Sequence, residues 1–254
     1  MFTRALVRPP GRSLVEGLTT ANLGEPKYHK AVDQHAAYVE ALQACGLDVC
    51  VLPPLEDFPD SCFIEDVALL TPRCAIITRP GAPSRMGEIG GMREILSQYY
   101  DAAIEQVQAP GTVEGGDILM VGSHFYIGLS ARTNLEGARQ VIEFLKDYDL
   151  SGSTVPLQEI LHLKTGIAYL EENTLAACGE ILSREEFSSF TILPVPEEES
   201  YAANCIWVNG TVLVPAGFPR TSGIIQKAGY PVLEVDVSEF RKLDGGLSCL
   251  SLRF

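Results

Sequence analysis

Paired apolar segments joined by short turns most constrain the fold of this chain. Four such pairs recur along the 254 residues, and each reads as two antiparallel strands: 66–70 with 74–78, 117–121 with 125–128, 167–170 with 175–178, and 205–208 with 212–214. The last pair turns at Asn209-Gly210, a strong signal for a two-residue hairpin. Residues 248–254 and 2–7 remain as single apolar segments, and their pairing with each other would complete a fifth unit.

Helical patterns lie between these strand pairs, near 28–45, 87–100, 134–148, 184–189, 219–228 and 238–242. In the first of them Ala31, His35, Tyr38 and Leu42 share one face, and Gly46 can end the helix. Each unit therefore reads as ββαβ, with a repeat of about 50 residues. A closed ring of such units predicts an α/β fold, a five-fold pseudosymmetric α/β-propeller in one domain over 1–254. The pattern alone leaves open an α+β domain whose hairpins form no ring.

The charge balance narrows the class of partner. The chain has 19 Lys and Arg against 33 Asp and Glu, a net charge of −14. Phosphate binding needs a basic face, so we expect no nucleic acid, and a cationic small molecule suits the charge better. No apolar run approaches the roughly 18 residues of a membrane span, and the first residues, MFTRALVRPPGRS, lack the apolar core of a secretory signal. We therefore expect no membrane partner and a cytoplasmic location, while the oligomeric state stays open, with a homodimer among the options.

Seven cysteines and four histidines are the residues for metal or nucleophilic chemistry. They form no CxxC and no HExxH, so the pattern predicts neither a disulfide framework nor a metal site. Most of the cysteines lie in apolar runs, where a thiol behaves as a small buried hydrophobe. For Cys249, in Gly-Gly-Leu-Ser-Cys-Leu, the residues alone leave both a buried structural thiol and a reactive one open.

Reactive side chains stand at equivalent ends of the predicted strands. FIED at 63–66 opens the first hairpin, EGGD at 114–117 opens the second, His162 precedes the third, and Cys249 opens the last strand. In a propeller such strand ends meet near the axis, which would bring carboxylates, an imidazole and a thiol together.

These segments resemble the dimethylarginine dimethylaminohydrolase family of the guanidine-modifying (pentein) superfamily. The resemblance runs nearly end to end, through FIED, ITRPGAPSR (77–85), EGGD, GLSARTN (128–134), HLK (162–164), AANCI (202–206) and LDGGLSC (243–249). It implies the pentein fold and, from the compact length, a bacterial member. The related arginine deiminases carry an inserted helical domain for which this chain has no room, and a basic residue where it has Glu65.

The resemblance implies hydrolysis of asymmetric dimethylarginine and monomethylarginine to citrulline and an amine, with no metal or organic cofactor. Cys249 would be the nucleophile, because a soft thiolate suits the guanidinium carbon, and would form a covalent thiouronium intermediate. His162 would serve as general acid and base, with Glu114 as the third catalytic residue. A free thiol is mostly protonated at neutral pH, so we predict that the bound cationic substrate assists its ionisation.

The resemblance also implies how the substrate is held. Asp66 and Glu114 would grip the guanidinium, Phe63 and Glu65 would contact its methylated end, and two arginines would bind the α-carboxylate. Asp60 would take the α-ammonium with backbone carbonyls near Leu18 and Leu243, 17–24 would form a lid, and Asp117 would shape the site. The implied substrate contacts are Leu18, Asp60, Phe63, Glu65, Asp66, Arg85, Arg132, Leu243 and Ser248.

Three other readings stay open at this point. The chain could be another amidino hydrolase, an arginine deiminase or a deiminase of agmatine-like amines, although Arg85 and Arg132 suit a substrate with a carboxylate. It could be a non-catalytic ring that binds a macromolecule, although such a ring has no need of Cys249, His162 and both acids. A stray zinc ion could also bind Cys249 and His162 as an inhibitor, with only two good ligands in prospect.

Overall fold

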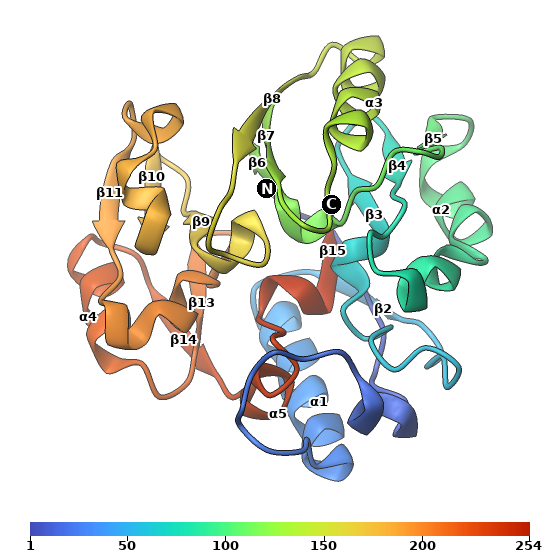
Figure 1. Ribbon diagram of the computed structural model, residues 1–254. Helices are drawn as coiled ribbons and strands as arrows, with labels where there is room; N and C mark the ends of the chain where they lie inside the picture. The colour runs from blue at the N-terminus through green and yellow to red at the C-terminus, as the bar shows by residue number, and fades with distance from the viewer. The chain divides into compact units, whose positions relative to one another are not determined.

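The computed structural model describes residues 1–254 and contains five three-stranded sheets (Figure 1). Their strand orders are β15-β1-β2, β3-β4-β5, β6-β7-β8, β9-β10-β11 and β12-β13-β14. In every sheet the middle strand runs antiparallel to the first and parallel to the third. The strands are β1 (Arg4–Val7), β2 (Asp48–Val51), β3 (Ala68–Leu70), β4 (Ala75–Ile77), β5 (Ile104–Gln106), β6 (Ile118–Val121), β7 (His124–Leu129), β8 (Ser151–Pro156), β9 (Ile167–Tyr169), β10 (Thr174–Ala177), β11 (Thr191–Pro194), β12 (Ile206–Val208), β13 (Thr211–Pro215), β14 (Val232–Val235) and β15 (Ser251–Arg253).

Helices occupy the connection between the second and third strand of each sheet. The α-helices are α1 (Tyr28–Ala44), α2 (Met92–Tyr100), α3 (Leu135–Asp147), α4 (Pro219–Lys227) and α5 (Ser238–Arg241). Short 3-10 helices, labelled η, are η1 (Arg12–Glu16), η2 (Ile64–Val67), η3 (Pro83–Ile89), η4 (Gly115–Asp117), η5 (Leu163–Thr165), η6 (Gly179–Ser183), η7 (Glu185–Phe187), η8 (Glu197–Ala203) and η9 (Ser248–Leu250). The predicted α/β fold of five ββαβ units is confirmed. None of the helices is both long and apolar enough to cross a membrane.

The chain forms two compact units, residues 1–64 with 165–253, and residues 65–164 with 254. We call them the first and the second unit and describe each by itself. The first unit contains the sheets β15-β1-β2, β9-β10-β11 and β12-β13-β14, and the second contains β3-β4-β5 and β6-β7-β8. The prediction that 1–254 act as one domain stays a prediction.

The two ends of the sequence pair within the first unit. Strand β1 lies antiparallel to β15, with Leu6 opposite Leu252, as the single apolar segments at the ends predict. Helix α1 contacts β2 and α5, and its buried face includes Ala31, His35, Tyr38 and Leu42. Gly46 has a φ of 88°, a conformation that favours glycine, and it ends the helix as predicted.

The second unit is built around the predicted hairpins β3-β4 and β6-β7. Helix α3 contacts β7 and β8, and buries Val141 and Leu145 against Phe125 and Ile127. Asn134 begins this helix, because its side chain accepts a hydrogen bond of 2.8 Å from the backbone N of Gly137. The helix expected near 87–100 is divided between η3 and α2.

A 3-10 turn leads into the first strand of every sheet. These turns are η2, η4, η5, η8 and η9, which come before β3, β6, β9, β12 and β15. Cys249 therefore lies in the turn η9, whereas the sequence placed it at the start of a strand. The helix expected over 184–189 was also wrong: only the three-residue η7 forms there, since Phe187 alone of its residues is buried. The turns set the reactive side chains at the strand entrances.

Candidate active site

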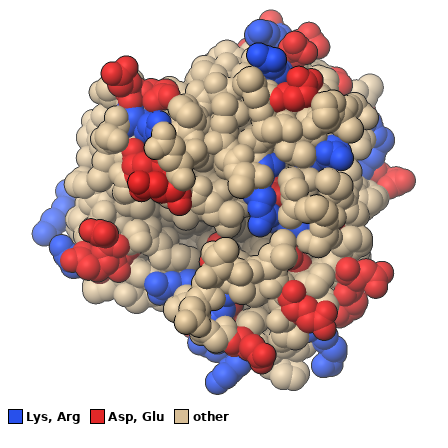
Figure 2. Space-filling model, in the orientation of Figure 1, with Lys and Arg blue, Asp and Glu red and all other residues tan.

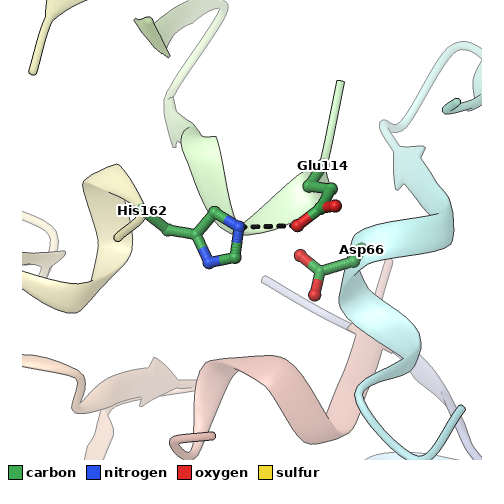
Figure 3. A group of neighbouring side chains, drawn as sticks. All are labelled: Asp66, Glu114 and His162. Carbon is green, nitrogen blue, oxygen red and sulfur yellow. Dashed lines mark hydrogen bonds and ion pairs between the residues drawn. The ribbon is translucent and has the colours of Figure 1, made fainter. Parts of the chain in front are cut away.

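Asp66, Glu114 and His162 come together in the second unit (Figure 3). Asp66 lies in η2, Glu114 immediately precedes η4, and His162 immediately precedes η5. The Nε2 atom of His162 lies 2.8 Å from Oε2 of Glu114, and one ligand atom from each of the three side chains lies within 4.8 Å of the others. Three residues from distant parts of the sequence thus form one buried acid–base cluster.

The Glu114 carboxylate is fully buried and bonded on both oxygens. Oε1 accepts hydrogen bonds from the backbone N atoms of Gly81, at 3.0 Å, and Ala82, at 3.2 Å. Arg132 lies 3.3 Å from the same oxygen through its Nη1. Burial by itself would raise the pKa of Glu114, but the hydrogen bond to His162 and the charges of His162, Arg85 and Arg132 lower the pKa to about 2. Glu114 is therefore an anion throughout the neutral range.

His162 is held as a cation by its hydrogen bond to Glu114 and by the neighbouring carboxylates. Burial by itself would lower the pKa of His162, but the hydrogen bond to Glu114 and the charges of Asp66, Asp117 and Glu114 outweigh it and raise the pKa to about 9. The side chain therefore holds a proton at neutral pH that it can deliver to a leaving group. A metal ion at these three residues would have to displace that proton from His162.

Gly116 permits this close packing. A Cβ at this position would lie 3.0 Å from Oδ1 of Asp66 and 3.0 Å from Cγ of His162. The Gly116 N–H instead donates a hydrogen bond of 2.8 Å to Oδ1 of Asp66. The Gly-Gly in EGGD therefore lets the backbone approach both functional side chains, in agreement with the sequence analysis.

Arg85 fixes the other oxygen of Asp66. Its Nη1 lies 2.6 Å from Oδ2 of Asp66, while Nε and Nη2 bind the two oxygens of Glu88 at 2.9 and 2.8 Å. All three side chains are buried. Burial would lower the pKa of Arg85, but the carboxylates of Asp66 and Glu88 raise it, so the guanidinium keeps its charge. Arg132 is more accessible, with 22% of its side chain exposed.

Asp117 holds the backbone next to His162. Its Oδ1 accepts a hydrogen bond of 2.9 Å from the backbone N of Leu163, and its Oδ2 accepts bonds of 2.7 Å from the hydroxyls of Ser130 and Thr133. Burial raises the pKa of Asp117, against the opposing effects of the His162 charge and these bonds. The 128–134 loop and the His162 segment are thereby tied to one carboxylate.

Glu65 has a partner that the sequence analysis missed. Its Oε1 lies 2.6 Å from Nζ of Lys164, and both side chains are largely buried. Lys164 was visible only as part of the HLK motif, and nothing in its spacing connects it with Glu65. A close ion pair of this kind fixes the direction of the Glu65 carboxylate.

In the first unit, Cys249 lies in a turn that is bonded at almost every residue. The backbone N of Gly246 donates to Sγ of Cys249 at 3.4 Å, and the Ser248 Oγ is 4.0 Å from that sulfur. Tyr38 donates to the carbonyl of Leu247 at 2.9 Å. Asn204 bonds to Ser248 through both ends of its amide. The cysteine side chain is half-buried, unlike the buried thiols of the core.

A second group of predicted residues meets elsewhere in the first unit. The backbone N of Leu18 donates to Oδ1 of Asp60 at 3.0 Å, and the space beside Gly17 is bounded by Asp60 and Leu243. Phe63 is buried, with its ring 6.2 Å from that of Phe240. The 17–24 loop is mostly exposed and is tied down where Thr20 donates to Asp244 at 2.6 Å.

The structure thus divides the predicted site residues between its two units. The second unit brings together Asp66, Arg85, Glu114, Arg132 and His162, and it also contains Glu65, which follows Ile64 in η2 and pairs with Lys164. The first unit contains Leu18, Asp60, Phe63, Leu243, Ser248 and Cys249. The residues that sequence reasoning missed are Glu88, Lys164, Tyr38 and Asn204.

Comparison with known proteins points to one family. The family model for eukaryotic N,N dimethylarginine dimethylhydrolase matches residues 21–205. The N(G),N(G)-dimethylarginine dimethylaminohydrolase of Pseudomonas aeruginosa is 60% identical over 254 residues, which cover 100% of both chains. Its C249S mutant has been solved in complex with citrulline, with a TM-score of 0.99, 59% identity and full coverage of both chains. A dimethylarginine dimethylaminohydrolase H162G adduct with S-methyl-L-thiocitrulline has a TM-score of 0.98, again with 59% identity and full coverage of both chains. The predicted pentein fold is thereby confirmed.

Proposed function

Because the chain belongs to the dimethylarginine dimethylaminohydrolase family, we propose that it hydrolyses asymmetric dimethylarginine and monomethylarginine to citrulline and dimethylamine or methylamine. The observation that carries this proposal is the buried Glu114–His162 pair beside Asp66, which offers carboxylates to a guanidinium and a proton to its leaving amine. The mutated positions of the two solved relatives, 249 and 162, bear the numbers of Cys and His in this chain.

Substrate recognition is proposed as follows. The carboxylates of Asp66 and Glu114 accept N–H bonds from the guanidinium, and Glu65 with Phe63 faces its methylated nitrogen. Arg132 is the first candidate for the α-carboxylate because it is the more exposed of the two arginines, and Arg85 adds its charge. The α-ammonium is assigned to Asp60 with the backbone carbonyls of Leu18 and Leu243, and Ser248 completes the proposed contacts.

The first chemical step forms a covalent intermediate. The Cys249 thiol gives its proton to solvent, the resulting thiolate adds to the guanidino carbon, and a C–S bond forms. The bond from this carbon to the methylated nitrogen then breaks, and His162 gives that nitrogen its proton. Dimethylamine leaves, and a cationic thiouronium group remains on Cys249.

The second step releases citrulline. His162, now neutral, takes a proton from water, and the water oxygen adds to the same carbon. The C–S bond breaks, the carbon keeps the oxygen as the ureido carbonyl, and the proton of that oxygen passes to the leaving sulfur, so Cys249 returns to a thiol and His162 to a cation. The sum is one water consumed for each amine released, and the proposal calls for no cofactor.

Citrulline formation tests this proposal. Asymmetric dimethylarginine, monomethylarginine and arginine are compared at equal concentrations, with citrulline, methylamines and ammonia measured separately. We expect citrulline with a methylamine from the first two substrates, no activity in Cys249→Ser, and wild-type activity in Cys50→Ser, which alters an exposed thiol of the same unit. A fully active Cys249→Ser protein would refute the mechanism, and ammonia release from arginine alone would favour a deiminase.

Cellular setting and assembly are part of the same proposal. We propose that residues 1–254 act as one catalytic domain, since the proposed chemistry uses Cys249 of the first unit and His162 of the second.

The seven cysteines are free thiols, which supports a reducing cytoplasmic location. Basic side chains stand in small groups among acidic and uncharged ones on the face in Figure 2, which supports a small-molecule partner rather than nucleic acid or a membrane. A homodimer stays a prediction that light scattering would test.

A further inference from the structure

Asn204 is a buried polar residue in an apolar run, between Ala203 and Cys205, just after η8. Its Oδ1 accepts a hydrogen bond of 2.9 Å from the backbone N of Ser248, and its Nδ2 donates one of 2.9 Å to the Oγ of Ser248. One planar amide therefore grips one residue at two points. That residue immediately precedes Cys249.

The two bonds fix the direction of the Ser248 hydroxyl. A backbone N–H can only donate, so it must face the amide oxygen, and the orientation of the Asn204 amide follows. The Nδ2 then donates to the Ser248 oxygen, so the hydroxyl proton points away from Asn204. The Sγ of Cys249 lies 4.0 Å from that oxygen. Either atom of this contact could be the donor while the sulfur is a thiol, but an ionised sulfur can only accept.

Other hydrogen bonds hold the rest of the turn. The Gly246 N–H donates to Sγ at 3.4 Å. Gly246 has to be glycine here, because a Cβ at this position would collide with the Asn204 side chain. Tyr201 donates to the carbonyl of Gly245 at 2.7 Å, and Tyr38 to that of Leu247 at 2.9 Å. The sulfur thus sits on a turn that is held at several points, with the Gly246 N–H as a donor and the Ser248 hydroxyl 4.0 Å away.

We propose that Asn204 is a positioning residue for the Cys249 nucleophile, which it serves by holding Ser248 so that the serine hydroxyl donates to the sulfur when the sulfur is ionised. The inference rests on the proposed function, in which the thiol loses its proton before attack. A hydrogen bond to an ionised acceptor is shorter and stronger than one to a neutral acceptor, so the 4.0 Å contact tightens at that moment.

Two variants separate this role from a structural one. Asn204→Asp keeps the shape and an acceptor for the Ser248 N–H, but it has no N–H of its own. The serine hydroxyl then donates to the new carboxylate and can no longer donate to the sulfur. Ser248→Ala removes the hydroxyl directly. The rate of alkylation of Cys249 by iodoacetamide is measured against pH without substrate, and the modified peptide is resolved by mass spectrometry because Cys50 is also exposed.

We expect each variant to move the midpoint of the alkylation profile upward by about one pH unit, the effect of one lost bond to a charged acceptor. Asn204→Asp also adds charge, so its shift is measured again in a Ser248→Ala background. We expect a smaller shift there, because the hydroxyl that Asn204 directs is already gone. Equal shifts in both backgrounds, or an unchanged midpoint in Ser248→Ala, would overturn the proposal. The Ser248→Ala result decides the question even if Asn204→Asp fails to fold.

Asn209→Asp is the matched control. Asn209 also lies in the first unit, where its amide bonds to Phe2 N, Phe2 O and Cys45 O without contacting η9. We expect a lower melting temperature for this control but an unchanged alkylation midpoint. In citrulline assays, Asn204→Asp should lower kcat more than it raises KM. A wild type that makes no citrulline, but whose alkylation midpoint shifts as expected in the variants, would remove the hydrolase proposal and keep the positioning role.

Discussion

Glu114→Gln tests the electrostatic reasoning for the active site. Glutamine has the shape of glutamate and keeps an oxygen to accept from the backbone N atoms of Gly81 and Ala82. It carries no charge, however, and its amide N–H would face the Nε2 of His162, which can accept that bond only when the imidazole is neutral. Both changes favour the neutral form of His162.

The magnitude follows from the pKa of His162. The rise from the ordinary 6.5 to about 9 corresponds to about 3 kcal/mol at 1.36 kcal/mol per pH unit. Glu114 supplies the hydrogen bond and one of the three charges that cause this rise. We therefore expect Glu114→Gln to lower the pKa of His162 by at least one pH unit, or about 1.4 kcal/mol.

The pH dependence of stability has a definite sign. Because folding raises the pKa of His162, the stabilisation is complete below pH 6.5 and is lost as the pH rises through about 9. Folding lowers the pKa of Glu114 from 4.5 to about 2, so the same interaction is lost as the pH falls below 4.5. The two pKa shifts describe one Glu114–His162 interaction, and their free energies are not added. The pair stabilises the wild type most between pH 4.5 and 6.5. Between pH 6.5 and 9 the free energy of unfolding should fall less in Glu114→Gln than in the wild type.

The assay is an NMR titration of the imidazole protons. The chain has four histidines, and a His162→Gln sample identifies the signal of His162. His124 is the internal control: it belongs to the same unit, and its ring bonds to Ser151 and Ser153 and packs against Tyr126, so its titration should not move. An unchanged His162 midpoint in Glu114→Gln, with the fold intact, would refute the reasoning. So would a wild-type His162 that titrates near 6.5.

Three further predictions concern the substrate, the thiol and the turn. Arg132→Lys should raise KM for methylarginines by about tenfold with a smaller change in kcat, because an ammonium cannot bind a carboxylate through two parallel bonds; steady-state kinetics measures both constants. Alkylation of Cys249 by a neutral reagent should speed up when a cationic, non-hydrolysable guanidine is bound and leaves the sulfur accessible, and an unchanged rate with confirmed binding would contradict substrate-assisted ionisation. Gly246→Ala should cost about 1–3 kcal/mol and lower the melting temperature by several degrees, because the new methyl meets Asn204, whereas Gly223→Ala in α4, with open space at its Cβ, should not destabilise the fold.

Local patterns account for the part of the fold that the sequence predicts well. The hairpin at Asn209-Gly210 and the helix over Tyr28–Ala44 are each specified by neighbouring residues, through turn chemistry and through one apolar face. The pairing of Leu6 with Leu252 was predicted by elimination, because the two terminal segments were the strands left without a partner. The helix expected at 184–189 does not form. Its short pattern places only Phe187 in the core, which is too little burial to support an α-helix.

The active-site roles could be predicted only as far as a motif carries them. EGGD and HLK draw attention to Glu114 and His162, but nothing in either motif indicates that the two side chains share a hydrogen bond. The roles of Glu88 and Lys164 as ion-pair partners could not be predicted from the sequence. A charged residue on a polar stretch is usually exposed, and only the fold shows that Glu88 is buried against Arg85 and that Lys164 reaches Glu65.

Asn204 is a different case, because its sequence context did contain a signal. An amide buried without partners costs several kcal/mol, so an asparagine inside the apolar run Ala-Ala-Asn-Cys-Ile has to find hydrogen bonds in the folded chain. The sequence does not name the partner, since Ser248 lies 44 residues away. Glu199 is also buried and bonds to the backbone N and the hydroxyl of Thr221, but it follows two other glutamates, so its sequence context carries no such signal. Glu199 holds the start of α4, whereas Asn204 holds the turn that carries Cys249. A polar residue in an apolar run therefore indicates a buried clamp, and the function of the clamp is decided by what it holds.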